Sequence, residues 1–381
     1  MPDTTLRLDP EIIIGQDTVN RLGSFCSNLG RKVFLIAEPG LYEHKLIERV
    51  LKVFEDAGLE VILFDEIPTQ ATAEAADNAA FLARGARCDM VVGFGSIKAQ
   101  YTARLAAIIA ASQFRLFELL DGMREENACL PYVAIPSTWE DPFLLSDFLV
   151  AIDPRDRFTK LIKCPRRLCH AVILDSSLAE PLSGTSAPTA VFDSLCSSLE
   201  AYCSTKSSLL SDAFLEQAIS LYAGIMLSNP EQPVSDTLNA SIYAGLLMSM
   251  GASASAPGIG TALAYALNGK FSITKSWCST VLLPYVIEKL IASRPEKMAK
   301  VASLMGEIVE GRSVSESANM TVDIVRRHMG NFQVPARLKD FNLPLDRLLP
   351  LAEAARNLEF VSFSPWTVAS EDAYDLLKQA F

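Results

Sequence analysis

The first half of this chain repeats one pattern: a short apolar run, a turn, and then a stretch with helical spacing. The run KVFLIA at 32–37 precedes a helical stretch at 43–58, and the run VILF at 61–64 precedes another at 72–86. Strands that alternate with helices of this length form βαβ units, in which the strands lie parallel in a buried sheet. The pattern therefore predicts a doubly wound domain of the nucleotide-binding type.

The pattern continues with DMVVG at 89–93 and YVAI at 132–135, and it changes after Pro181, beyond which strand signals nearly vanish. Helical spacing then dominates, at 186–225, 234–254, 258–268, 280–292, 296–310, 314–329 and 368–380. We predict an α/β plus all-α protein, with a Rossmann-like parallel-sheet domain over residues 1–180 and an all-helical domain over residues 181–381. The length of 381 residues is also typical of two domains rather than one.

Charge and composition narrow the classes of partner. The net charge of −11 repels nucleic acid phosphates and anionic lipids, so we expect neither nucleic acid nor membrane as a partner. The N-terminal residues lack the charged and apolar regions of a signal peptide, and no apolar stretch reaches the roughly 20 residues of a membrane span. We therefore expect a cytoplasmic protein.

The cysteines and histidines limit which kinds of metal, redox or acid–base site the chain can form. The eight cysteines include no CxxC pair, and in a cytoplasmic protein we expect them to be reduced thiols, most of them buried. The chain has only three histidines, His44, His170 and His328, which argues against histidine-rich metal or acid–base chemistry.

A glycine-containing turn follows the predicted strand at 89–93. Gly93, Gly95 and Ser96 stand where that strand gives way to a helix, and backbone N–H groups at such a helix start form a cradle for phosphate. The same turn can serve only to make the corner between strand and helix. Glu38 ends the strand at 32–37, where its carboxylate could hold a ribose hydroxyl or remain a solvated loop acid.

Several stretches together resemble the iron-containing (group III) alcohol dehydrogenases. These stretches are IIIG at 12–15 with Leu22-Gly23, DMVVGFGS at 89–96, AIPST at 134–138, AVILDSSL at 171–178, DSLCSSLEAY at 193–202, the segment from Gly260 to Gly269 with Lys275, and LLPYV at 282–286. The resemblance covers nearly the whole chain in the same order. It implies a Rossmann-like domain joined to a helical domain. It also implies a cleft between the two domains for a nicotinamide cofactor, a divalent metal and an alcohol or aldehyde, and a homo-oligomer such as a dimer.

The metal-binding positions of that family depart from its pattern here. The resemblance places the family's one aspartate ligand on Asp193 and its three histidine ligands on Ser197, Thr261 and Lys275. A further family histidine, often assigned to proton transfer, falls on Tyr265. Without the histidines we expect no iron or zinc, and we expect Asp193 and Lys275 to form a direct ion pair. The soft donors Cys196 and Cys278 lie near these positions in the sequence and leave a rebuilt thiolate site open.

The cofactor segments depart from the family pattern too. The family's glycine-rich motif keeps Gly93, Gly95 and Ser96 here but has lost its later aspartate and lysine, and Thr138 keeps the place of a family threonine. The small-residue loop that follows reads WEDPF at 139–143. Two acids there would repel a pyrophosphate, and the rings would fill space, so NAD or NADP binding is possible but weakened. The cofactor candidates are Gly93, Gly95, Ser96, Glu38 and Thr138.

Two functions are compatible with these residues. One is a non-catalytic relative that binds a metabolite in the interdomain cleft or binds a partner protein, or that serves as a structural subunit, with Lys275 neutralising Asp193. The other is a metal-independent NAD(P)-dependent alcohol or aldehyde oxidoreductase, in which Asp193, Ser197, Tyr265 and Lys275 share the site. Tyr265 would then donate the proton, and Lys275 would lower the pKa of the phenol and polarise the carbonyl.

Overall fold

The computed structural model describes residues 6–67, 73–126, 128–179, 186–227, 234–334 and 336–381. The chain divides into two compact units. One comprises Leu8–Thr138 and Asp147–Pro181, and the other comprises Met1–Arg7, Trp139–Ser146 and Leu182–Phe381. We call them the sheet unit and the helical unit.

The sheet unit is built on six strands that pair in the order β1-β8-β5-β4-β2-β3, and every pairing between them is parallel. The strands are β1 (Glu11–Ile14), β2 (Lys32–Ala37), β3 (Glu60–Phe64), β4 (Met90–Gly95), β5 (Tyr132–Pro136) and β8 (Cys169–Leu174). The central strands β2, β4 and β5 are buried along almost their whole length, as expected for a parallel sheet covered on both faces. The predicted α/β domain is confirmed.

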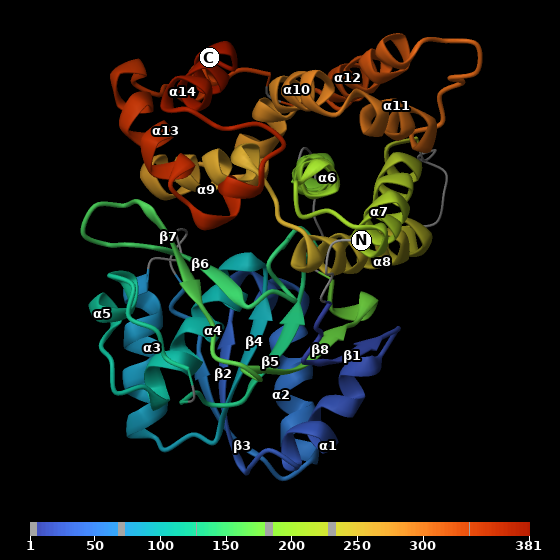
Figure 1. Ribbon diagram of the computed structural model, residues 1–381. Coiled ribbons are helices and arrows are strands. Elements are labelled where there is room, and N and C mark those ends of the chain that lie inside the picture. Colours follow the sequence, from blue (N-terminus) through green and yellow to red (C-terminus); the bar gives the residue numbers. More distant parts are fainter. Residues whose placement is uncertain (1–5, 68–72, 127, 180–185, 228–233, 335) are drawn as a thin grey trace. The chain divides into compact units, whose positions relative to one another are not determined.

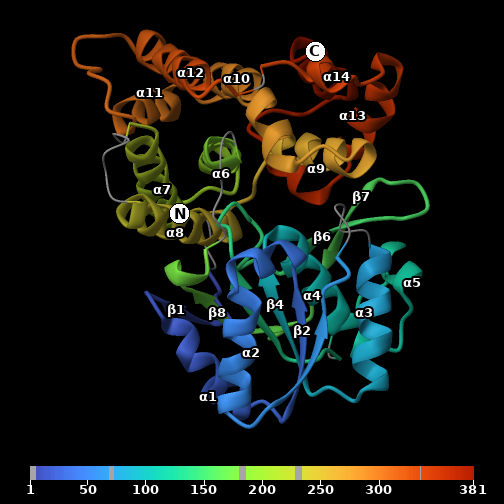
Figure 2. The same ribbon diagram turned by 180° about the vertical axis from the view of Figure 1, so that it is seen from behind.

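Helices cover both faces of the sheet (Figures 1 and 2). The helices are α1 (Leu22–Ser27), α2 (Leu46–Asp56), α3 (Ala73–Gly85), α4 (Ile97–Ala111) and α5 (Leu116–Leu120), with short 3-10 turns at Thr18–Arg21, Pro39–His44 and Ser176–Leu178. In the two opposite views α1 and α2 lie together over one face, and α3 and α4 lie over the other. One core cluster includes Leu22, Ile47, Phe54 and Val92 and lies between the sheet and the helices α1 and α2.

A short antiparallel hairpin, formed by β6 (Phe148–Ile152) and β7 (Thr159–Lys163), stands apart from the main sheet. Asp153 follows β6 and is fully buried, and its carboxylate accepts hydrogen bonds from the backbone and side chain of Arg155. Arg155 also pairs with Asp121, the residue after α5, at 2.5 Å between Nη2 and Oδ1. This ion pair connects the hairpin turn to the end of α5. The sequence pattern did not predict these two strands.

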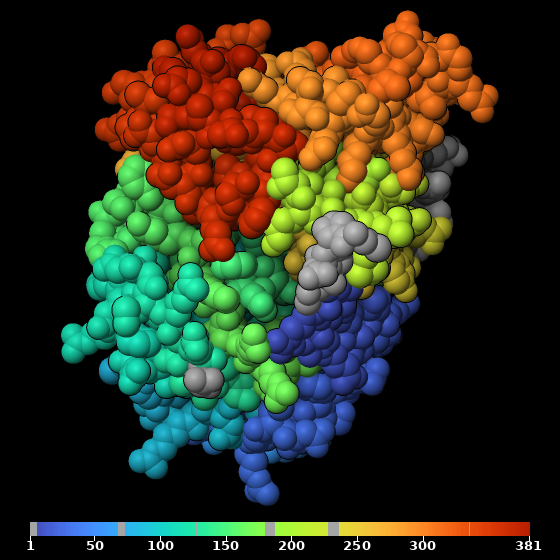
Figure 3. Space-filling view, viewed as in Figure 1, coloured from blue at the N-terminus to red at the C-terminus, as the bar shows by residue number. Residues whose placement is uncertain are grey.

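The helical unit contains α6 (Ser186–Cys203), α7 (Leu209–Leu227), α8 (Val234–Ala254), α9 (Ile259–Phe271), α10 (Lys275–Ser293), α11 (Pro295–Leu304), α12 (Val314–Asn331), α13 (Leu348–Arg356) and α14 (Ser370–Gln379). Three 3-10 turns join the later helices, at Leu338–Phe341, Leu345–Arg347 and Glu359–Phe363. Figure 3 shows the orange and red C-terminal segments of this unit as one continuous surface. Among the described residues, none of the helices combines the length and apolar character that a bilayer crossing requires.

Two local predictions for this unit are wrong. The helix predicted over 186–225 is broken between Cys203 and Leu209, where Thr205 donates its backbone N–H to the carbonyl of Phe363 at 2.8 Å. The Ser- and Thr-rich sequence STKSS at the break offers side-chain hydrogen bonds that compete with the helix. The helix predicted over 280–292 begins earlier, because Lys275 is the first residue of α10.

The segment Trp139–Ser146 also departs from the expected organisation. It belongs to the helical unit, although its neighbours on both sides in sequence belong to the sheet unit. Asp141 to Leu145 are buried. The backbone N–H of Leu145 donates to Oγ of Ser249 on α8 at 3.1 Å. The prediction that residues 1–180 form one domain therefore does not hold for residues 139–146, which belong to the helical unit.

Candidate functional site

Asp193 on α6 and Lys275 at the start of α10 meet in the interior of the helical unit. The Lys275 ammonium nitrogen lies 2.7 Å from Oδ1 and 2.8 Å from Oδ2 of Asp193. The Asp193 side chain is fully buried, and that of Lys275 is 8% exposed. A charge-assisted contact to both carboxylate oxygens satisfies a carboxylate that would otherwise be very costly to bury. The expected ion pair is confirmed.

One helical turn after Asp193, Ser197 begins a chain of hydrogen bonds to α9. The hydroxyls of Ser197 and Thr261 are 3.1 Å apart, and the Thr261 hydroxyl donates to Oε2 of Glu200 at 2.7 Å. Because the single Thr261 hydroxyl proton is committed to the carboxylate, Ser197 must be the donor in its bond with Thr261. Asp193, Ser197 and Glu200 follow the i, i+4, i+7 spacing that places them on one face of α6.

Glu200 is the residue of this region that the sequence analysis missed. Its carboxylate also accepts the backbone N–H groups of Gly258, Gly260 and Thr261, at 3.1, 2.6 and 2.9 Å. These groups form the start of α9, where a helix leaves its N–H groups without partners and favours a negative charge. Burial raises the pKa of Glu200, while the hydrogen bonds from Thr261 and Gly260 oppose that shift. Its helical spacing from Asp193 and Ser197 was the feature of the sequence that could have identified it as a site residue.

Tyr265 lies one turn beyond Thr261 on α9 and is 4% exposed. The Lys275 ammonium stands over the Tyr265 ring, 4.8 Å from its centre, which is the geometry of a cation–π contact. Lys275 thus contacts both Asp193 and Tyr265, while Ser197 contacts Thr261, one turn before Tyr265 on α9. The ammonium lies over the flat side of the ring, so it contacts the π system of Tyr265.

The two cysteines near this cluster are fully buried, Cys196 on α6 and Cys278 on α10. Burial is the main cause that raises the pKa of both thiols well above the usual range, and the charge of Asp193 adds to it. Without a metal cation beside them, this burial disfavours the thiolate form in which a cysteine binds a metal. Among the residues that the structure describes, no three His, Cys, Asp or Glu side chains are grouped as a metal site.

The glycine turn of the sheet unit brings together the ends of β2 and β4. Gly95 has φ of 140°, and a Cβ there would lie 2.9 Å from Cβ of Ala99 and from Cγ of Glu38, so the position requires glycine. Ser96 precedes the first turn of α4, and its hydroxyl donates to the carboxylate of Glu38. Glu38 is therefore part of the turn and not the solvated loop acid considered above, since it is only 8% exposed.

Gln100 holds the strand ends around this turn, and the sequence analysis missed it too. Its amide nitrogen lies 3.2, 2.9 and 3.1 Å from the carbonyl oxygens of Gly93, Gly95 and Ile135. Its amide oxygen accepts from the hydroxyl of Tyr132. Gly93 itself has no room for a Cβ, which would lie 2.8 Å from Cβ of Ala103. Thr138, the last cofactor candidate, is buried two residues after β5.

Comparisons with known proteins identify the relationship. A family model described as iron-containing alcohol dehydrogenase matches residues 9–176, and the C-terminal model of the Fe-containing alcohol dehydrogenase family matches residues 187–381. The chain belongs to the iron-containing alcohol dehydrogenase family. The resemblance proposed from the sequence is thereby confirmed.

Individual relatives are distant but extend along the whole chain. An NAD-dependent methanol dehydrogenase of Bacillus methanolicus is 23% identical, over 99% of this chain and 100% of the relative. A 1,3-propanediol dehydrogenase of Klebsiella pneumoniae is 26% identical, over 96% of each chain. The crystal structure of a 1,3-propanediol oxidoreductase superposes with a TM-score of 0.93 at 23% identity and covers 100% of both chains. The fold of this family member is therefore that of its solved relatives.

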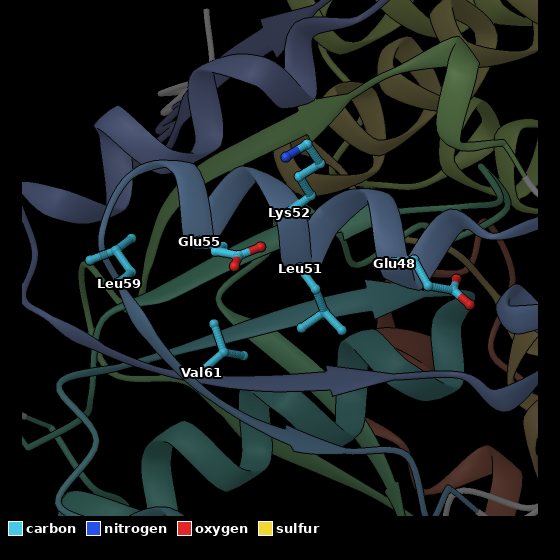
Figure 4. A pocket seen from close by; sticks show the side chains of 6 residues that line it. All are labelled: Glu48, Leu51, Lys52, Glu55, Leu59 and Val61. Carbon is cyan, nitrogen blue, oxygen red and sulfur yellow. The ribbon is translucent and has the colours of Figure 1, made fainter.

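The described surface pockets of this family member lie away from these residues. The larger one, about 440 Å³, is lined by Glu48, Leu51, Lys52, Glu55, Leu59 and Val61. Figure 4 shows these side chains on α2, on the turn after it and on β3. The other, about 270 Å³, is lined by residues 124–126 and 163–166 of the sheet unit. None of the candidate site residues lines either pocket.

The buried pair generates a test of stability. Replacing Lys275 with Met should leave Asp193 as an uncompensated buried charge and cost about 3–5 kcal/mol of folding free energy. The double variant Asp193→Leu/Lys275→Met should recover most of that loss, because apolar residues of similar volume can replace a buried ion pair. Scanning calorimetry and chemical denaturation would measure both.

A matched control is available on the same helix. Lys289 of α10 pairs with Asp372 across 3.6 Å, and both side chains are about one third exposed. Lys289→Met should therefore cost less than about 1 kcal/mol. Equal losses for Lys275→Met and Lys289→Met would show that the Asp193–Lys275 pair contributes no more than a surface contact.

Proposed function

We propose that this chain works without a divalent metal, as a non-catalytic member of its family that binds a small metabolite. The observation that carries the proposal is the contact of the Lys275 ammonium with both carboxylate oxygens of Asp193, at 2.7 and 2.8 Å. The carboxylate that the family resemblance assigns to the metal is therefore engaged by a fixed positive charge. A small molecule is the ligand class that the net charge of −11 favours over nucleic acid or anionic lipid.

The residues at the four metal-ligand positions do not fit iron or zinc. They are one carboxylate, two hydroxyls and one ammonium, and the nitrogen or sulfur donors that give these metals their affinity are missing. The hydroxyls of Ser197 and Thr261 already bond to each other, and Thr261 bonds to Glu200. An ammonium about 4 Å from a cation adds a repulsion of about 4 kcal/mol per unit charge at an effective dielectric near 20.

Metal analysis tests this proposal directly. Protein purified without chelators and dialysed against iron or zinc should hold far less than one metal ion per chain, by mass spectrometry of the dissolved metal. The triple variant Ser197→His/Thr261→His/Lys275→His restores three nitrogen donors beside Asp193, and it should bind about one ion. Adding Asp193→Ala to that variant is the matched control and should weaken binding. One ion per wild-type chain, lost in Asp193→Ala, would refute the proposal.

A second candidate function is a metal-independent NAD(P)-dependent oxidoreductase. Two observations favour it: the Lys275 ammonium lies against Tyr265, and the turn at Gly95 and Ser96 keeps its glycine geometry at the start of α4. Free N–H groups at such a helix start suit a pyrophosphate, and Glu38 and Thr138 would stand beside the nucleotide. A bound nicotinamide supplies hydride chemistry, and Tyr265 and Lys275 would supply the proton and the positive charge.

Cofactor titration separates the two candidates. If the second is correct, NADH should change the protein's fluorescence with saturation, and Gly95→Ala should weaken the affinity at least tenfold because its Cβ would meet Ala99 and Glu38 at 2.9 Å. Gly85→Ala is the control, since a Cβ at Gly85 meets nothing within 4 Å. No response of wild-type protein to millimolar NADH or NADPH would remove the oxidoreductase candidate.

The role of Tyr265 needs a separate test. If wild-type protein reduces any member of a broad aldehyde panel, Tyr265→Phe should lower kcat by roughly a hundredfold, because it removes the proton donor and keeps the ring. The folding free energy should change little, and the activity should resist chelators. A reductase rate that is unchanged in Tyr265→Phe would contradict the Tyr265–Lys275 mechanism.

A further inference from the structure

The segment Trp139–Ser146 is seated closely on the helices of its unit. A Cβ at Gly245 of α8 would lie 2.4 Å from the carbonyl oxygen of Trp139, so glycine is what allows the segment to approach the helix. One turn later, Ser249 accepts the backbone N–H of Leu145 at 3.1 Å. Within the segment, the Asp141 carboxylate accepts the backbone N–H of Phe143 at 2.8 Å. The segment is thus fixed at its beginning, middle and end.

This seating places the Phe143 ring in the candidate site. The ring centre of Phe143 lies 6.1 Å from that of Tyr265 and 5.3 Å from that of Phe360, with tilted planes. The three side chains are 3%, 4% and 5% exposed. Aromatic rings at these separations are in favourable contact. Tyr265 is therefore shared between Phe143, which comes from the segment, and the ammonium of Lys275.

We infer that Trp139–Ser146 is an internal plug, and that Phe143 is the residue that determines which ligands can reach Tyr265 and Lys275. Its ring occupies the volume that a ligand ring beside Tyr265 would need. The inference deepens the proposed metal-free binding function, on which it rests, by defining the shape of the site. While the plug is seated, the Phe143 ring stays in contact with Tyr265, which also lies against the Lys275 ammonium.

The surroundings of the plug define the chemistry of a ligand that replaces it. The ligand needs a flat apolar ring to restore the contacts of Phe143 with Tyr265 and Phe360. It also needs a neutral hydrogen-bond acceptor. Two hydrogens of the Lys275 ammonium are committed to Asp193, and an ammonium carries three donors, so one remains. The Asp193 carboxylate would repel an anionic ligand. The class is a neutral aromatic compound with a carbonyl or hydroxyl group.

The experiment compares two ways of removing the plug. Phe143→Ala deletes the ring and opens a cavity lined by apolar side chains, and such cavities bind small aromatic molecules. Gly245→Ala instead adds a methyl group against Trp139 and should unseat the segment. The control for the second is Gly224→Ala on α7, where a Cβ meets nothing within 4 Å. The control for the first is Phe54→Ala in the sheet unit, which opens a cavity among the apolar side chains of a core cluster and should therefore prefer ethylbenzene to benzamide.

The probes are benzamide, which has the ring and the acceptor, and ethylbenzene, which has only the ring. Calorimetric titration should show benzamide binding to Phe143→Ala and to Gly245→Ala at least tenfold tighter than to wild type, Gly224→Ala or Phe54→Ala. Benzamide should also bind Phe143→Ala tighter than ethylbenzene does. Folding of each variant is checked by circular dichroism, and Gly245→Ala remains informative if Phe143→Ala does not fold.

Two results would overturn the inference. If wild-type protein binds benzamide as tightly as Phe143→Ala does, the ring does not block the site. If folded Phe143→Ala and folded Gly245→Ala both fail to bind, the segment does not cover a ligand site. Neither result depends on the metal content of the protein, so a failure of the plug is distinguishable from a failure of the metal-free proposal.

Discussion

The helical unit depends on how it satisfies one buried carboxylate. Asp193 lies on α6 with no exposed surface, and its only charged partner among the described contacts is the ammonium of Lys275 on α10. The partner must stay in place, because a buried carboxylate without a counter-charge would destabilise the fold by several kcal/mol. A metal ion at this point would hold several helices by its coordination bonds. Here an ion pair joins α6 to α10, and the bonds from Ser197 and Glu200 to Thr261 join α6 to α9.

The contact between α6 and α9 also explains why aromatic side chains gather in the candidate site. Glu200 fixes the start of α9 through three backbone N–H groups, and this sets the position of Tyr265 one turn later. Tyr265 needs apolar or cationic neighbours in a dry interior, and Phe143 and Lys275 supply both. The glycine at position 245 of α8 allows the segment that carries Phe143 to approach the helix closely at Trp139. The aromatic cluster around Tyr265 and the Asp193–Lys275 ion pair are therefore packed together, because the Lys275 ammonium lies against the Tyr265 ring.

The sequence predicted most of the fold and the centre of the site, for reasons that are local. Apolar runs followed by helical spacing identified four of the six sheet strands, β2 to β5, and the boundary near Pro181 followed from the loss of that pattern. The ion pair was predictable because the family resemblance assigns Asp193 and Lys275 to ligands of one ion. Glu200 and Gln100 were not predictable in their roles, because each acts on backbone groups whose positions only the tertiary fold defines.

The segment 139–146 is the clearest case of information that the sequence does not carry. Its two acids predicted repulsion of a pyrophosphate, yet Asp141 is buried and holds the backbone N–H of its own loop at Phe143. The rings were expected to fill space, but the sequence could not show that Phe143 would fill it against α9. The placement of this segment depends on contacts between residues far apart in the sequence, such as Gly245 with Trp139 and Ser249 with Leu145, and the periodicity of the sequence does not indicate such contacts.

Charge balance decides which of the two functions the cluster suits better. A divalent ion held by one carboxylate and neutral ligands keeps a net charge of about +1, which can stabilise a developing alkoxide. The ammonium of Lys275 together with the carboxylate of Asp193 has no net charge, and the two groups are in direct contact. At about 4 Å and an effective dielectric near 20, the missing unit charge is worth about 4 kcal/mol, or roughly a thousandfold in rate. A neutral pair of this kind can still donate one hydrogen bond to a neutral acceptor. This charge balance supports the proposed binding of a small uncharged molecule over the second candidate, the reduction of a carbonyl.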